Sequence, residues 1–215
     1  AENIQDGIAV NCGVGLPVQS DSQVDSFLLI MKDYPQFYTA MQAEGREWVD
    51  LFTMESIEKF DYVFTDAMTF TDEKGRRNRI WLPDETFIDD EEEFMNYLVK
   101  TLVTILYTEP VDIYVNATFL PEQMADRYDH FWTEERMDTV INALKSNNIA
   151  MEINNRYEIP SADFIKRAKK AGVRFTVGTN NADGNFSGAK YALDIIKKCS
   201  LAESDFWLPV KKERI

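Results

Sequence analysis

The sequence predicts an α/β fold with parallel strands, the greater part of one (β/α) barrel. Short apolar runs recur along the chain, and longer amphipathic stretches separate them, which is the pattern of βα units. Most of the runs are continuous, as expected of strands that are buried on both faces. The 215 residues, 45% of them hydrophobic, suit a single domain over residues 1–215 with a sizeable core.

Six runs are the predicted strands, with amphipathic helices between them. The strands are expected over residues 8–11, 37–43, 62–66, 111–116, 149–154 and 174–178. Residues 70–87 break this rhythm, because Gly75 lies among charged residues that include Arg76, Arg77 and Arg79. This segment is predicted to form a hairpin-like excursion. Its basic cluster is either an anion-binding loop or a solvated turn paired with nearby acids.

Start and stop signals define the helices. Ser22 is expected to cap a helix that runs through Met31, and Asp89 precedes an acidic first turn that suits a helix N-terminus. Thr133 and Ser161 each precede a stretch with apolar residues on one helical face, and the second stretch ends at Gly172, a C′ residue. A final helix is predicted to start at Ser187.

Composition excludes several classes of function. The formal net charge of −14 repels nucleic acid phosphates and anionic membrane surfaces. The apolar runs are shorter than the roughly 20 residues that a membrane span needs, and no signal peptide is visible in the first residues. Cys12 and Cys199 lie far apart without CxxC spacing, which fits buried thiols and a cytoplasmic location.

A polar residue ends each predicted strand or follows it within two residues. The carboxyl ends of parallel strands are where sites form in barrels and open sheets, so a shared polar pocket is predicted there. Acids at these ends could bind a divalent cation, and nearby arginines could hold a phosphate or carboxylate group or neutralise the acids. The candidate acids and arginines are Glu44, Asp66, Glu152, Arg46 and Arg156, and the candidate ligand-binding amides are Asn11, Asn116, Asn154, Asn180 and Asn181.

The last third of the chain carries a family resemblance. Residues 149–154, followed by 159–161, 164–165, Ala168, 172–173 and 177–180, resemble the C-terminal half of polymerase and histidinol phosphatase (PHP) domains. A weaker likeness includes residues 61–63 and 111–114. The resemblance implies a distorted TIM-like (β/α)7 barrel with divalent metals at the C-terminal mouth and phosphoesterase activity. Glu44 matches a glutamate ligand of that family.

The departures from the family concern its metal ligands. PHP domains begin with a strand that bears His-x-His, whereas this chain opens near what would be the second strand, so the first βα unit is expected to be absent. Asn180 and Ala182 stand where the family has an aspartate and a histidine, and Asn116 stands where another histidine is expected. The only histidine, His130, lies between helices and away from the strand ends.

Two functions from different classes fit these residues. The first is a divergent PHP-like hydrolase of phosphate esters, in which Glu44, Asp66 and Glu152 hold a divalent cation (Mn²⁺, Mg²⁺ or Zn²⁺) and an arginine binds the anionic substrate. The second is a non-catalytic barrel that has lost its metal ligands and binds a small polar or anionic ligand through its amides. A carboxylate pair acting on a glycoside is a third option, but no spacing singles out such a pair. The expected partner in the first two cases is a small molecule.

Overall fold

The computed structural model describes residues 7–180 and 188–212. The chain divides into two compact units. Of the described residues, unit 1 comprises 7–65, 110–112 and 208–212, and unit 2 comprises 66–109, 113–180 and 188–207. Each unit is described by itself.

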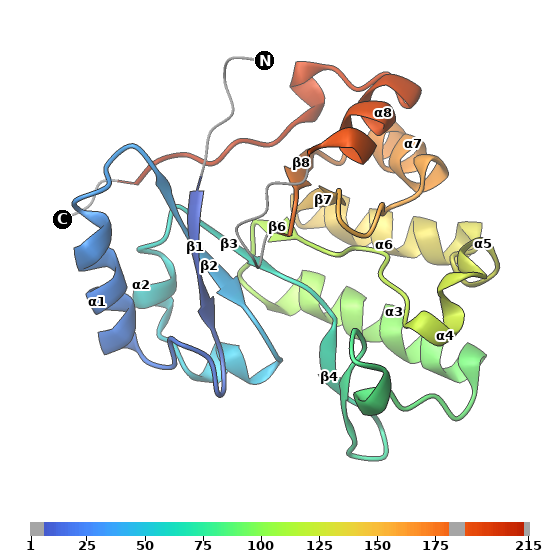
Figure 1. Cartoon of the computed structure of the whole chain (residues 1–215), viewed down its shortest axis with the longest axis horizontal. Coiled ribbons are helices and arrows are strands. Elements are labelled where there is room, and N and C mark those ends of the chain that lie inside the picture. The colour runs from blue at the N-terminus through green and yellow to red at the C-terminus, as the bar shows by residue number, and fades with distance from the viewer. Residues whose placement is uncertain (1–6, 181–187, 213–215) are drawn as a thin grey trace. The chain divides into compact units, whose positions relative to one another are not determined.

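Unit 1 is a parallel three-stranded sheet with short helices (Figure 1). Its strands, in the order β1-β2-β3, are β1 (Gly7–Cys12), β2 (Tyr38–Ala43) and β3 (Tyr62–Thr65), and its helices are α1 (Asp21–Met31), η1 (Glu47–Asp50) and α2 (Met54–Ile57). Gly7 pairs with Tyr38, and Ala40 pairs with Tyr62. Buried side chains such as Met41, Trp48 and Phe60 form the core of this unit.

A segment from the far end of the described chain completes unit 1. Asp61, 6% exposed, accepts hydrogen bonds at Oδ2 from the backbone N–H of Thr39 (2.7 Å) and from its hydroxyl (3.0 Å). The other oxygen, Oδ1, accepts the backbone N–H of Lys212 at 2.6 Å. The ammonium group of Lys212 also donates to the carbonyl of Glu58 at 2.8 Å. Asp61 therefore joins strand β2 to residues that follow the whole of unit 2 in sequence.

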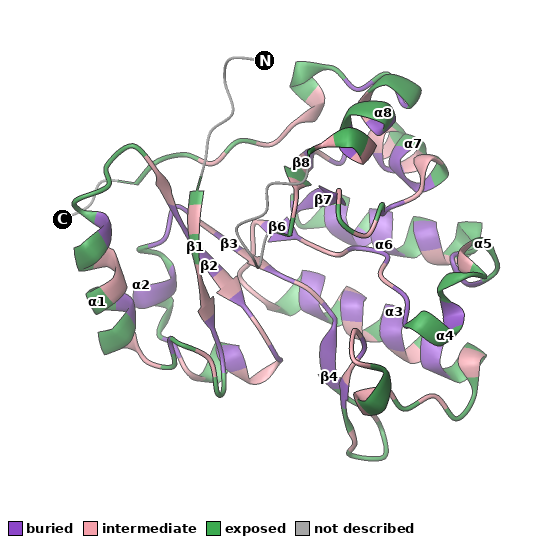
Figure 2. Cartoon of the chain, viewed as in Figure 1, coloured by how far each residue is buried: buried purple, intermediate pink, exposed green. Residues whose placement is uncertain are grey.

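Unit 2 contains the parallel strands β6-β7-β8, packed with helices. The strands are β6 (Ile113–Tyr114), β7 (Ala150–Asn154) and β8 (Phe175–Gly178). The helices are α3 (Glu91–Thr108), α4 (Glu122–Ala125), α5 (Tyr128–Phe131), α6 (Glu134–Ser146), α7 (Ala162–Ala171) and α8 (Lys190–Lys198), with short turns η2 (Pro83–Glu85) and η3 (Glu203–Asp205). Helix α6 contacts both α3 and α7. Figure 2 shows that α3 and α6 each have a buried and an exposed face.

The predicted hairpin is present at the start of unit 2. Strands β4 (Thr69–Thr71) and β5 (Arg77–Arg79) pair in antiparallel fashion, and Gly75 has a φ of 78° in the turn. Arg76 contacts the carboxylates of Asp72 and Asp89, each at 2.7 Å, and Arg79 pairs with Glu85. These two arginines are paired with acids, so the ion-paired turn is the better of the two interpretations.

Helix boundaries agree with most of the sequence signals. Thr133 and Ser161 accept the N–H of Arg136 and Phe164 as N-caps, and Gly172 has a left-handed φ of 83°. One predicted cap is shifted in the structure, since the N-cap of α1 is Ser20 and not Ser22. The acidic first turn predicted after Asp89 is present in α3, and Asp90 is its N-cap, because the Asp90 carboxylate accepts the N–H of Glu93. Ser187 lies outside the described residues.

The strand predictions hold for all six parallel strands, although β6 is confined to Ile113–Tyr114. The α/β class with parallel strands is therefore confirmed. The seven-stranded barrel and the single domain over residues 1–215 stay predictions. Among the described helices, none is long and apolar enough to cross a membrane.

Candidate functional site

Four polar side chains of unit 2 form one hydrogen-bonded network. Asn116 donates from Nδ2 to Asp66 Oδ2 at 3.0 Å, and its Oδ1 accepts Asn154 Nδ2 at 2.8 Å. Asn154 Nδ2 also donates to Glu152 Oε2 at 3.1 Å. The second oxygen of Asp66 accepts the backbone N–H of Met68 at 2.9 Å. The network therefore runs from one carboxyl group, through two amides, to the other carboxyl group.

Strand β7 positions two members of this network. All five of its residues are buried, and Glu152 and Asn154 are two apart, so their side chains point to the same face of the sheet. Glu152 pairs in register with Thr176, and Asn154 pairs with Gly178. A Cβ atom at Gly178 would lie 1.6 Å from Glu152 Oε1. The absence of a side chain at this position therefore makes room for the glutamate.

Asn116 contacts both carboxyl groups because of its backbone conformation. Its φ is 53°, a left-handed value that asparagine adopts more readily than most residues. In this conformation its backbone N–H donates to Glu152 Oε2 at 3.0 Å, while its side chain reaches Asp66. A residue with a branched β-carbon would not fit this conformation without strain.

The carboxyl group of Glu152 has an altered acidity. Burial raises its pKa above the ordinary glutamate value, because the ionised form loses solvation. The two N–H groups from Asn116 and Asn154 act in the opposite direction, and the negative charge of Asp66 adds to the rise. A buried carboxyl group of this kind can hold and deliver a proton.

An arginine lies on the turn that follows β7. The side-chain Oδ1 of Asn154 accepts the backbone N–H groups of Arg156 and Tyr157, each at 3.0 Å. The exposed Arg156 guanidinium lies 5.8 Å from the centre of the Tyr157 ring and donates to the carbonyl of Asn180 at 3.3 Å. Its planar group can bind phosphate or carboxylate oxygens.

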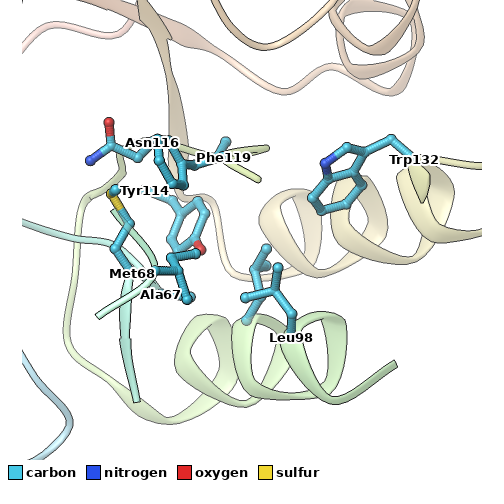
Figure 3. Close-up of a pocket in the computed structure, with 10 residues that line it drawn as sticks. Ala67, Met68, Leu98, Tyr114, Asn116, Phe119 and Trp132 are labelled. Carbon is cyan, nitrogen blue, oxygen red and sulfur yellow. The ribbon is translucent and has the colours of Figure 1, made fainter. Parts of the chain in front are cut away.

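A small pocket adjoins the network at Asn116 (Figure 3). Its lining is mostly apolar and includes Met68, Leu98, Phe119 and Trp132. The cavity has a volume of about 10 Å³, which is room for about one water molecule. The pocket is too small to hold a substrate group as it stands.

The remaining candidates lie in unit 1. Glu44 Oε1 accepts N–H groups from the side chains of Asn11 (3.0 Å) and Gln42 (3.1 Å). Arg46 donates to the hydroxyl of Thr65 at 3.0 Å, and this hydroxyl donates to the carbonyl of Ala43 at 2.6 Å.

Cys12, also in unit 1, behaves as a buried thiol. Burial, together with the charge of Glu44, raises the pKa of Cys12 to about 12. The thiol is therefore protonated at neutral pH and is a poor nucleophile or metal ligand.

The structure thus places the predicted site residues in two groups. Unit 1 holds Asn11, Glu44 and Arg46, and unit 2 holds Asp66, Asn116, Glu152, Asn154, Arg156 and Asn180. Asn181 lies outside the described residues. Sequence reasoning missed Gly178, since only the strand register places it against Glu152. The exposed His130 lies on α5, with its Nε2 3.7 Å from Glu92.

The residues of unit 2 do not fit a divalent cation by themselves. Three of the four carboxylate oxygens of Asp66 and Glu152 accept N–H groups, and a cation would compete with these donors for their lone pairs. Among the described residues, no three His, Cys, Asp or Glu side chains are grouped so that they could hold a metal ion. The predicted cation site of Glu44, Asp66 and Glu152 stays a prediction.

Comparisons with known proteins show a likeness of structure. No family model matches the chain, and no curated protein matches it. Its structure is similar to that of histidinol phosphate phosphatase from Lactococcus lactis subsp. lactis, solved in complex with zinc, L-histidinol and phosphate. The TM-score is 0.58 at 15% sequence identity, over 91% of this chain and 81% of that chain. The chain therefore has a fold similar to that of this phosphatase.

Proposed function

We propose that this chain is a divergent PHP-like phosphoesterase that acts on a small anionic substrate. The observation that carries the proposal is Glu152, a buried carboxyl group with a raised pKa on β7. It is hydrogen-bonded to Asn154, the last residue of that strand, and the carboxyl ends of strands are where α/β folds place their reacting groups. The similarity to a phosphatase, solved with phosphate and a small alcohol, supports the same class of substrate.

The residues of unit 2 have complementary roles in this proposal. Arg156 binds the phosphate group of the ester, and its charge offsets the charge that the transferring group carries. Asp66 orients a water molecule and accepts its proton as the water oxygen attacks phosphorus. The bond between phosphorus and the ester oxygen breaks, and Glu152 gives its proton to that oxygen. The products are an alcohol and inorganic phosphate, and transfer of a proton from Asp66 to Glu152 through solvent restores the starting state.

No step of this scheme passes through a metal ion, since the described donors of unit 2 do not fit one. The assay nevertheless includes Mn²⁺, Mg²⁺ and Zn²⁺ in separate arms, because Glu44, Asp66 and Glu152 are the predicted ligands. A rise in activity with one cation that is lost in Glu44→Gln would support the predicted cation site. An equal response in both proteins would remove Glu44 from it.

The direct test measures release of inorganic phosphate from a panel of small phosphate monoesters. Glu152→Gln is expected to lower kcat by about 10²–10⁴-fold, the usual contribution of a general acid. The matched control is Asp112→Asn. Asp112 is also a carboxyl group whose pKa burial raises, but it accepts the backbone N–H of Val63 in unit 1 and has no role in the scheme.

Two results would overturn the proposal. One is equal activity in Glu152→Gln and the wild type. The other is a complete lack of phosphate release with every ester and cation. If phosphate still binds in the second case, the amides and Arg156 form a binding site for a small anion without catalysis.

A further inference from the structure

Asn154 uses every hydrogen-bonding position of its side chain. A side-chain amide offers two N–H donors and two acceptor lone pairs. In Asn154 the donors serve Asn116 Oδ1 and Glu152 Oε2, and the acceptor oxygen takes the N–H groups of Arg156 and Tyr157. The residue is 1% exposed. Its side chain is therefore held from both ends.

The two ends of this amide contact two different parts of the candidate site. The Nδ2 end contacts Glu152, the proton donor of the proposed reaction. The Oδ1 end holds the first residues of the turn that carries Arg156, the anion-binding group. The backbone of Asn154 also pairs with Ile159, through N–H to carbonyl distances of 2.7 and 3.3 Å. Residues 155–158 thus form a short loop that is closed at its base and tied internally by one side chain.

We propose that Asn154 is a positioning residue that fixes the anion-binding turn and the proton-donating carboxyl group relative to each other. This inference rests on the proposed function for the roles of Arg156 and Glu152. The amide oxygen pre-orders the turn, so that less freedom is lost when Arg156 binds an anion. The amide nitrogen keeps Glu152 Oε2 in place, which orients the carboxyl group toward the same substrate.

Two substitutions separate the two ends of the amide. Asn154→Asp keeps an oxygen for the turn and removes the N–H donors, whereas Asn154→Ala removes both functions. Asn154→Asp is therefore expected to lower kcat while KM and the affinity for inorganic phosphate stay close to those of the wild type. Asn154→Ala is expected to weaken phosphate binding about 2- to 13-fold as well, because ordering one long side chain costs about 0.5–1.5 kcal/mol.

The deciding measurement is the Kd for inorganic phosphate, by calorimetry on the full chain, since it needs no turnover. The Kd of Arg156→Gln shows how much phosphate affinity remains without the guanidinium group. The matched control is Asn78→Asp in β5. Asn78 is 0% exposed, accepts the N–H of Phe87 at 2.8 Å and donates to the carbonyl of Arg76 at 3.3 Å. Asn78→Asp is therefore the same substitution at another buried, hydrogen-bonded asparagine, outside the candidate site.

The outcomes separate this inference from the proposed function. Weaker phosphate binding in Asn154→Ala and Arg156→Gln, but not in Asn154→Asp or Asn78→Asp, supports it, whether or not any ester is hydrolysed. Wild-type phosphate affinity in Asn154→Ala, or no phosphate binding by the wild type, overturns it. If Asn154→Ala does not fold, Asn154→Leu replaces it, because leucine has nearly the shape of asparagine and also lacks both polar groups. The same weaker phosphate binding is then expected, and wild-type phosphate affinity in Asn154→Leu would overturn the inference.

Discussion

Gly178→Ala tests the packing of Glu152 directly. The new Cβ atom would lie 1.6 Å from Oε1 and 2.6 Å from Cδ of Glu152, so the glutamate side chain has to move. Two hydrogen bonds to its Oε2 are then lost, at about 0.5–1.5 kcal/mol each, and the strand is overpacked at a cost of about 1–3 kcal/mol. The gain from a stiffer unfolded chain is about 0.4–1 kcal/mol. The expected net loss is about 1–5 kcal/mol.

Urea unfolding followed by circular dichroism measures this loss. A double-mutant cycle shows whether the lost stability comes from the contact with Glu152, because Gly178→Ala should cost little when Glu152 is already alanine. Gly188→Ala is the control, since no atom lies within 4 Å of a Cβ built there. If Gly178→Ala leaves the unfolding free energy within about 0.5 kcal/mol of the wild type, the described position of the Glu152 side chain is wrong.

Three further predictions concern stability. The pKa of Glu152 is higher in the folded chain than in the unfolded chain, so the folded state holds this proton more tightly. The resulting stabilisation is fully present below the unfolded pKa of about 4.3, and it is lost as pH rises through the folded pKa. Unfolding free energies measured between those limits should fall by at most about 1.4 kcal/mol per pH unit from this group. The part of this pH dependence that comes from Glu152 should be missing in Glu152→Gln. Equal slopes of unfolding free energy against pH in the variant and the wild type would contradict the raised pKa of Glu152. Asp61→Ala removes the acceptor of the N–H groups of Thr39 and Lys212 and should cost about 2–4 kcal/mol in urea unfolding. Gly172→Ala places a side chain at a φ of 83° and should cost about 1–2 kcal/mol, measured as a lower Tm; a Tm equal to that of the wild type would refute the left-handed cap.

The strand pattern could be predicted from the sequence because each strand is a local apolar run. The length of β6 could not, since pairing with β7 covers only Ile113 and Tyr114 although the apolar run is longer. The shifted cap has a similar cause. Ser20 and Ser22 are both good N-cap residues, and the backbone conformation decides between them. The ion pair of Asp72 with Arg76 fits one of the two interpretations of the basic cluster, a turn paired with nearby acids, although the sequence analysis did not identify the partner acid.

Acids and amides at the strand ends were expected to gather, and four of them in unit 2 form one hydrogen-bonded network. That this network is the functional site stays a prediction, and the hydrogen-bond partners within it could not be predicted from the sequence. The role of Asn154 as the connecting residue depends on which side chains face each other across neighbouring strands. The left-handed backbone of Asn116 and the open position at Gly178 are also properties of the folded chain, and asparagine and glycine occur too often in turns for the sequence to reveal them.

The membership of residues 208–212 in unit 1 has a consequence for biosynthesis. Ribosomes deliver a chain from its N-terminus, so β1, β2 and β3 emerge long before Lys212. The hydrogen bond from Lys212 to Asp61 cannot form until all of unit 2 has been synthesised. We therefore expect unit 1 to finish folding after unit 2, although its strands are synthesised first. A nascent chain stalled before Leu208 should leave β2 and β3 open to proteases.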